Sequence, residues 1–210
     1  QLPDQQRGRE TIRAILHLYQ ACMSKLRVVL RAQSDLDLLL SLGLVQMYGV
    51  VGSTGYHPTL TSSSLAAGLP HFATHHMRCW GRDTFTAYKG FFLLSNQLLE
   101  GKAVIKAFAG CLFNGLIPNL LDAGRFPRFN SRDAVWWFVY AVVEHALVDA
   151  SILGEEVEMR SPEDIYSDYT EWLLSVKPTK TLKEILQQIF IRHAQGITFR
   201  EFNNPSQWSE

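Results

Sequence analysis

The stretch NSRDAVWWFVYAVVEHA, residues 130–146, carries the clearest helix signal in the chain. Asn130 or Ser131 can cap the helix, and Asp133 then falls in the first turn, near the positive end of the helix dipole. The apolar residues that follow recur at the three- and four-residue spacing of one helical face, namely Val135, Trp136, Val139, Val142, Val143 and Ala146. The pattern predicts a helix that begins at this cap.

Helical periodicity extends over most of the remaining chain. Residues 10–40 predict one or two helices, residues 182–194 predict another, and the Ser-Pro pair at residues 161–162 predicts the capped start of a further one. Residues 85–112 follow helical periods that are interrupted around residues 99–102. Because no convincing succession of strands accompanies these helices, we predict an all-α domain of stacked helical hairpins.

Two segments rich in turn-forming residues separate the predicted helices. GVVGSTGYHPTLTSSSLAAGLP, residues 49–70, combines glycine, serine, threonine and proline, which favour turns over regular structure. We predict one long loop over about residues 43–70. GLIPNLLDAGRFPRFN, residues 115–130, contains Pro118 and Pro127, and proline removes a backbone donor and disfavours helix in the residue before it. It predicts a second long loop.

Composition and charge limit the class of protein. The 210 residues are 47% hydrophobic, enough for one compact domain with a substantial core. Lysine and arginine together number 20, as do aspartate and glutamate, so the formal net charge is zero. A chain without a basic field is poorly suited to hold polyanionic nucleic acid, and we expect no nucleic-acid partner.

The apolar runs and the cysteines bear on the cellular compartment. Apolar runs such as FVYAVV from Phe138 are far shorter than the roughly 20 residues needed to cross a bilayer, and we expect no membrane partner. Cys22, Cys79 and Cys111 fit neither a disulfide framework nor paired zinc ligands, which favours a reducing compartment, the cytoplasm. Because the chain begins with Gln1 and ends in QWSE, we expect it to be a fragment.

The stretch CWGRDTF, residues 79–85, has the chemistry of a sugar-binding turn. The indole of Trp80 can stack on the apolar face of a sugar ring, while Arg82 and Asp83 can donate to and accept from adjacent hydroxyls. Gly81 would let the backbone approach closely. The structural alternative is a helix start in which Asp83 is the cap, Arg82 pairs with another acid and Trp80 fills the core.

A second cluster, RFNSRDAVWWF at residues 128–138, repeats this chemistry about fifty residues later. Its candidate substrate-binding residues are Arg128, Asn130, Asp133 and Trp136. The alternative is again a capped helix with core tryptophans, and we favour that interpretation for Trp137, because adjacent residues on a helix do not share a face. Two such clusters at two loop-to-helix junctions strengthen the sugar-site hypothesis.

Other chemistries find little support. His71, His75 and His76 lie close together in the sequence, but no carboxylate or second ligand pair accompanies them at a metal-binding spacing. The acidic segment at residues 155–158 predicts a solvated loop without an acid or base role. Neither a phosphate-binding glycine loop nor a GxSxG elbow occurs. We predict no metal and no cofactor, and carbohydrate chemistry is the leading class.

Four motifs of the chain carry a family resemblance. They are LAAGLPHF, RCWGRDTF, AFAGCLFNGLIPNLLDAGRFPRFNSRDAVWWF and HAQGITFREFN, which span residues 65–203. In this order they resemble the C-terminal glucosidase region of the eukaryotic glycogen debranching enzymes. The resemblance implies an (α/α)6 toroid of helical hairpins, of which residues 1–210 would be the N-terminal portion, incomplete at its C-terminal side. It also implies hydrolysis of α-1,6-linked glucose in glycogen, in an enzyme whose transferase half is absent here.

The resemblance also implies roles for individual residues. In related toroid glycosidases the Arg-Asp pair after a tryptophan binds hydroxyls of the glucose next to the scissile bond, and Arg82 and Asp83 match that pair. Asn130, Asp133 and Trp136 match a second loop around the same pocket. The family's acid follows a Thr-Trp-Met-Asp motif, which does not occur here. Its base lies in a Pro-Glu segment near the family's C-terminus, whereas the one Pro-Glu pair of this chain, at residues 162–163, precedes the last matched motif.

The missing carboxylates leave more than one hypothesis open. Glycoside hydrolysis needs two carboxyl groups, so we predict no catalytic residue within the chain, and the chain alone is expected to be inactive. Its expected partners are a branched α-glucan, the remaining half of the toroid and the transferase domain. A non-catalytic glucan-binding or interaction remnant is the alternative, and a purely structural helical scaffold is the third hypothesis.

Overall fold

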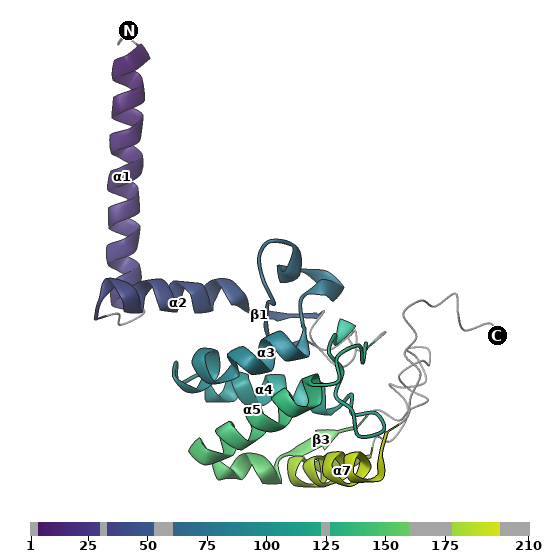
Figure 1. Cartoon of the computed structure of the whole chain (residues 1–210). Coiled ribbons are helices and arrows are strands. Elements are labelled where there is room, and N and C mark those ends of the chain that lie inside the picture. Colours follow the sequence, from purple (N-terminus) through teal and green to yellow (C-terminus); the bar gives the residue numbers. More distant parts are fainter. Residues whose placement is uncertain (1–3, 30–32, 53–60, 123–126, 160–177, 198–210) are drawn as a thin grey trace, which may run out of the picture. The chain divides into compact units, whose positions relative to one another are not determined.

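The computed structural model describes residues 4–29, 33–52, 61–122, 127–159 and 178–197 (Figure 1). The chain divides into two compact units, residues 1–46 and 47–210. The first unit holds helix α1 (Asp4–Val29) and nearly all of helix α2 (Asp35–Met47). The prediction of one or two helices over residues 10–40 is therefore confirmed as two. Within the described residues, no helix is both long and apolar enough to cross a membrane.

A serine and an aspartate begin α2. The Ser34 hydroxyl accepts a hydrogen bond from the Asp37 backbone N–H at 3.1 Å, and the Asp37 carboxylate accepts one from the Ser34 N–H at 3.0 Å. This reciprocal pair satisfies two backbone donors that the first helical turn leaves free. Arg27, near the end of α1, forms an ion pair with Asp35 of α2.

The core of the second unit is built from α3 (Gly81–Tyr88), α4 (Leu98–Ala109) and α5 (Ala134–Val148). The Phe85 ring of α3 lies 4.9 Å from the ring of Phe108 in α4 and 5.3 Å from that of Phe138 in α5, both edge-to-face. Such aromatic contacts add to the free energy of burial. These three helices therefore share one aromatic centre.

The helical region after α3 is interrupted earlier than expected. A π-helical turn, η4 (Lys89–Leu93), extends α3, and α4 begins at Leu98. Asn96 in the break has a φ of 59°, a left-handed conformation that asparagine tolerates better than most residues. The interruption predicted around residues 99–102 thus lies a few residues before them, because periodicity does not fix helix ends.

Two small antiparallel hairpins correct the all-α prediction, although the chain is mostly helical. Strand β1 (Tyr48–Val51) pairs with β2 (Ser62–Leu65), and Tyr48 lies opposite Leu65. Strand β3 (Glu156–Glu158) pairs with β4 (Thr179–Thr181). The long loop expected over residues 43–70 therefore contains the end of α2 and a hairpin. Pairing between distant segments supplies the backbone partners that the local composition does not reveal.

A buried arginine fastens the first hairpin to the segment that leads into α3. The Arg78 side chain donates to the Ser64 hydroxyl at 2.7 Å, to the Met47 carbonyl at 2.8 Å and to the Ala73 carbonyl at 2.5 Å. Only 5% of Arg78 is exposed, so each donor that finds an acceptor offsets the cost of burying the charge. Gly49 leaves room for it, since a Cβ there would lie 2.7 Å from the guanidinium.

The remaining elements are short turns and one helix. They are the 3-10 turns η2 (His71–Ala73), η3 (His75–Met77) and η6 (Ala150–Gly154), and the helix α7 (Leu182–Gln195). Helix α7 confirms the helix predicted over residues 182–194. The capped helix predicted to open at residues 161–162 lies outside the described residues.

Candidate functional site

The two predicted sugar-binding clusters meet through an ion pair. The Arg82 guanidinium donates to one carboxylate oxygen of Asp133, from Nε at 3.0 Å and from Nη2 at 2.5 Å. About half of each side chain is exposed. The structure therefore brings together the loop-to-helix junctions before α3 and before α5. It also agrees with one element of the structural alternative, since Arg82 does pair with an acid.

An irregular strand-like layer holds the two junctions side by side. Leu120 forms an isolated antiparallel bridge with Trp80 on one side and with Arg128 on the other. The Leu121 N–H donates to the Cys79 carbonyl at 3.0 Å, and the Arg128 N–H donates to the Leu120 carbonyl at 2.8 Å. Leu120 and Leu121 are fully buried. The second predicted loop thus contains a buried segment that lies between the two clusters and pairs with both of them.

Gly81 and Asn119 form the closest contact at this layer. The Gly81 N–H donates to the Asn119 carbonyl at 2.5 Å. A Cβ at Gly81 would lie 2.7 Å from the Pro118 carbonyl oxygen, so only glycine fits without displacing the backbone. The close approach at Gly81 is therefore to another backbone segment of the protein, and its approach to a sugar stays a prediction.

Asn119 is a site residue that the sequence analysis missed. It is 7% exposed, and its side-chain oxygen accepts from the Arg82 N–H while its amide nitrogen donates to the Asn130 side chain, both at 3.1 Å. Its backbone N–H also donates to the Arg128 carbonyl at 2.7 Å. The signal that could have revealed it is one polar residue among Ile117, Leu120 and Leu121.

Asp133 collects several hydrogen bonds in addition to the ion pair. The Ser131 hydroxyl donates to it, and the Trp137 indole N–H donates to its second oxygen at 3.3 Å. The Arg82 hydrogen bond, followed by that from Ser131, lowers the pKa of Asp133 to about 2. Asp133 is the N-cap residue of α5, but its side chain makes no capping hydrogen bond. The cap predicted at Asn130 or Ser131 is therefore wrong, because the N-cap position is Asp133. The ion pair with Arg82 occupies the Asp133 carboxylate, which could otherwise have capped the helix.

Asp83 and Trp80 occupy the start of α3. Trp80 is the N-cap residue and Asp83 lies in the first turn, so the interpretation of Asp83 as the cap is wrong. Asp83 is exposed, and its carboxylate forms neither a hydrogen bond nor an ion pair with the described part of the chain. Trp80 is half-buried, and its indole N–H donates to the Met77 carbonyl at 2.8 Å.

The tandem tryptophans of α5 differ in their contacts. Trp136 lies against α7, with its ring 4.6 Å from that of His193 and 6.2 Å from that of Phe190. Trp137 instead contacts Asp133 and is 36% exposed. The expectation that Trp137 fills the core is therefore wrong. The register of the helix turns Trp137 toward the carboxylate at its own N-terminus.

Arg128 and Asn130 contribute in different ways. Arg128 is half-buried and takes part through its backbone bridge to Leu120. Asn130 is exposed and accepts from Asn119. Of the seven predicted residues, Arg82, Asp133 and Asn130 are thus linked directly or through Asn119. Trp80 and Asp83 lie within two residues of Arg82 in the sequence.

The histidines and the acidic segment singled out in the sequence are not part of the Arg82–Asp133 site. His71, His75 and His76 are exposed and lie in or beside short turns, and within the described ranges no group of three His, Cys, Asp or Glu residues could hold a metal. Glu155 is part of an ion-pair cluster instead of a solvated loop, since it accepts from Lys102 at 2.9 Å and from Lys106 at 3.2 Å.

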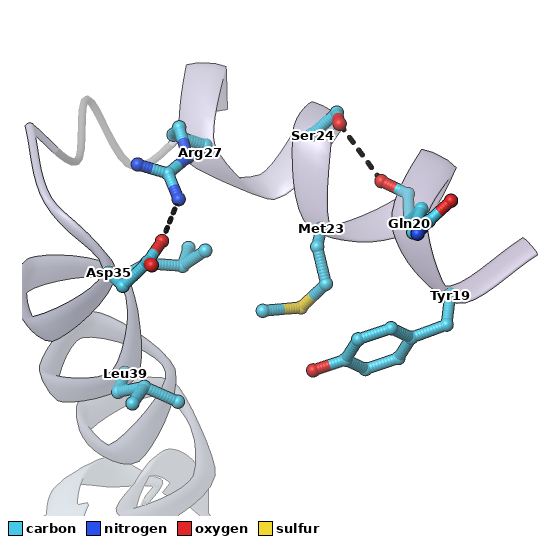
Figure 2. A pocket seen from close by; sticks show the side chains of 8 residues that line it. Tyr19, Gln20, Met23, Ser24, Arg27, Asp35 and Leu39 are labelled. Atoms are coloured by element: carbon cyan, nitrogen blue, oxygen red, sulfur yellow. Dashed lines mark hydrogen bonds and ion pairs between the residues drawn. The ribbon is translucent and has the colours of Figure 1, made fainter. Parts of the chain in front are cut away.

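A separate cavity lies within the first unit. It has a volume of about 440 Å³ and lies between α1 and α2 (Figure 2). Its lining residues are Tyr19, Gln20, Met23, Ser24, Arg27, Asp35, Leu38 and Leu39. None of the predicted sugar-binding residues lines it. The cavity therefore adds nothing to the chemistry of the Arg82–Asp133 site.

The arrangement at Arg82 can bind a polyhydroxylated ligand. The guanidinium has five N–H groups, and two of its nitrogens already donate to Asp133, so further donors are left for a ligand. Asp83, the next residue of α3, offers a carboxylate that has no hydrogen-bond partner among the described residues. Cys79, directly before Trp80, is buried, and burial raises the pKa of its thiol to about 12, which makes it unsuitable as a nucleophile.

Two comparisons with known proteins match the region that contains this site. Residues 42–206 match the family described as "Amylo-alpha-1,6-glucosidase". The chain is also 45% identical over 167 residues to a protein of Saccharomyces cerevisiae named "Glycogen debranching enzyme". The alignment covers 78% of the present chain and 11% of the yeast protein. The chain therefore spans about a tenth of the length of this relative.

Proposed function

The chain belongs to the amylo-alpha-1,6-glucosidase family, and from this premise we propose that it forms part of a glycogen debranching enzyme. In that enzyme it contributes to the hydrolysis of α-1,6-linked glucose at glycogen branch points. Its own part is to bind the glucose, through Trp80, Arg82, Asp83, Arg128, Asn130, Asp133 and Trp136. The proposed architecture is a portion of an (α/α)6 toroid.

The observation that carries the proposal is the meeting of the two junctions at the Arg82–Asp133 pair. The pair holds the guanidinium in one orientation, while the adjacent Asp83 carboxylate remains available. One sugar hydroxyl can donate to Asp83 while another accepts from Arg82, and hydrogen bonds to charged groups are the stronger kind. The Trp80 ring can pack on the apolar face of the sugar.

The same chemistry argues that the bond-breaking groups lie elsewhere in the polypeptide. A general acid must carry a proton at the working pH, and the low pKa of Asp133 keeps its carboxylate ionised. In the family, the two carboxylates that glycoside hydrolysis requires lie further along the polypeptide than the motifs found here. The proposed division of labour is glucose binding here and proton transfer in the remaining half of the toroid.

Exposed apolar side chains support a partner for this half. On α5 and α7, five large apolar residues are about half exposed or more, namely Val143, Leu147, Val148, Phe190 and Ile191. Extended apolar surfaces of this kind commonly mark interaction sites. We assign these faces to the rest of the toroid, with the transferase domain in the same polypeptide. None of the described cysteines forms a disulfide, in keeping with a cytoplasmic protein.

A glucan-binding protein without hydrolytic activity is the second candidate, and the absence of the Thr-Trp-Met-Asp motif from the sequence favours it. The complete polypeptide that carries this sequence can be assayed with a glucan bearing single α-1,6-linked glucosyl branches. The proposal expects release of free glucose. Retention on the glucan in affinity electrophoresis without glucose release would favour the binding protein. The absence of both retention and release would contradict both proposals.

A further inference from the structure

A fixed chain of hydrogen bonds at the site begins at a backbone donor. The Arg82 N–H can only donate, so the Asn119 side-chain atom 3.1 Å from it is the acceptor oxygen. The amide nitrogen of Asn119 must then be the atom that faces Asn130 at 3.1 Å. Because that nitrogen can only donate, it requires an acceptor, the carbonyl oxygen of the Asn130 amide. One backbone N–H therefore sets the orientation of two side-chain amides.

The end of this chain is exposed. Asn119 is 7% exposed, and its side chain is committed at both ends. Asn130 is exposed, and only its oxygen is used, so its NH2 group has no partner in the described part of the chain. A side-chain amide can turn over by exchanging its oxygen and nitrogen, but turning Asn130 over would place two amide NH2 groups against each other. Its outward-facing atom is therefore a donor.

Building on the function proposed above, we propose that Asn119 is a positioning residue that makes Asn130 a hydrogen-bond donor to one hydroxyl oxygen of the bound glucose. Asn130 lies two hydrogen bonds from the Arg82 backbone, at the junction that also carries Asp133. The site then recognises the sugar with a carboxylate acceptor at Asp83 and with donors from Arg82 and Asn130. Asn119 itself does not contact the sugar.

Asn119→Asp tests this relay with almost no change in shape. A carboxylate still accepts from the Arg82 N–H, but it cannot donate to Asn130. The Asn130 amide then turns over, gives its NH2 group to the carboxylate and presents its carbonyl oxygen to the sugar. Asn130→Asp, at the exposed position, also presents an oxygen while leaving Asn119 intact. Both variants thus replace the donor that faces the sugar at position 130 with an acceptor, one by turning the Asn130 amide over and the other by substituting it.

The experiment measures which of two sugar analogues binds more tightly, the deoxy sugar or the deoxyfluoro sugar. In the complete polypeptide, monodeoxyglucoses and the matching monodeoxyfluoroglucoses are tested as competitive inhibitors of glucose release. Fluorine can accept but cannot donate, so the wild type should bind the fluoro sugar more tightly than the deoxy sugar at one ring position, by at least about twofold. Glucose itself should bind about three- to tenfold more weakly to Asn119→Asp, the worth of one hydrogen bond.

At that ring position, Asn119→Asp and Asn130→Asp should both prefer the deoxy sugar. Asn96→Asp, an exposed control outside the site, should keep the wild-type order. If Asn119→Asp does not fold, Asn130→Asp alone decides.

The relay is overturned if either folded site variant keeps the wild-type order. If Asp83→Asn weakens inhibition by glucose while that order persists, the relay fails and the glucose site stands. If glucose and all its analogues fail to inhibit, the proposed function fails as well.

Discussion

At the scale of single residues, the site depends on how charges and amides satisfy one another. Arg82 and Asp133 are both about half exposed, so their pairing is screened by solvent and contributes little to stability. Its consequence is geometric, because it holds one face of the guanidinium and leaves the remaining donors free. Ser131 and Trp137 hold the same carboxylate. The pair is therefore more important for orientation than for folding.

The first prediction concerns the titration of Asp133. Hydrogen bonds from Arg82 and Ser131 lower its pKa from the ordinary 3.8 to about 2. A carboxyl whose pKa is lower in the folded state stabilises that state above its unfolded pKa, and the contribution disappears as the pH falls through the folded value. A carbon NMR titration of the carboxyl group should therefore give a midpoint near pH 2.

Replacing Arg82 with Gln should raise the pKa of Asp133 toward its ordinary value, because it removes the largest cause of the shift. The exposed neighbour Arg132 provides the matched control, and Arg132→Gln should leave the titration unchanged. A midpoint that stays the same in Arg82→Gln would show that the ion pair does not form in solution.

Sequence reasoning reached the residues of the site but not their connections. Arg82 and Asp133 were predicted as members of separate clusters, whereas their pairing across 51 positions requires the fold. Asn119 was missed because its side chain acts inside a segment that was predicted to be a loop. Trp136 and Trp137 were assigned by the rule that neighbours on a helix face apart. That rule separates the two residues but does not say which one faces the site.

At the scale of elements, helices were predictable and strands were not. Helix α5 follows its apolar period, and α7 begins at a capping box formed by Thr181 and Glu184, both of which are local signals. The hairpins β1–β2 and β3–β4 contain three or four residues per strand. Each depends on a distant partner, so local composition predicted turns and polar loops in their place.

The second prediction concerns the start of α7. The Thr181 hydroxyl accepts from the Glu184 N–H at 3.3 Å, and the Thr181 N–H donates to the Glu184 carboxylate at 2.7 Å. Thr181→Ala removes the first bond and should lower the free energy of unfolding by about 1 kcal/mol. Thr181→Ser keeps the hydroxyl and should cost much less.

Urea denaturation followed by tryptophan fluorescence can measure this difference. Trp136 reports on α7 because its ring lies 4.6 Å from that of His193 in that helix. Equal losses in the alanine and serine variants would show that the hydroxyl does not cap the helix. They would assign the loss to the packing of the threonine methyl group.

At the scale of the whole molecule, the family match begins at residue 42 and the second unit begins at Met47. Helix α1 and the first half of α2 therefore lie before the matched region, and the candidate site lies entirely within it. The motifs of this region predicted the family directly. The arrangement of a complete toroid is not visible in the described elements, and it remains part of the proposal.

The most direct test of the central claim, that this chain binds the glucose to be released, is the kinetics of Asp83→Asn in the complete polypeptide. Asp83 is exposed and occupies no capping position, so the substitution should leave folding intact. It replaces a charged acceptor with a neutral amide. We expect kcat/KM for glucose release from a branched dextrin to fall by about tenfold or more, as for the loss of a hydrogen bond to a charged group. An unchanged kcat/KM in the folded variant would contradict the claim and support a purely structural role for this junction.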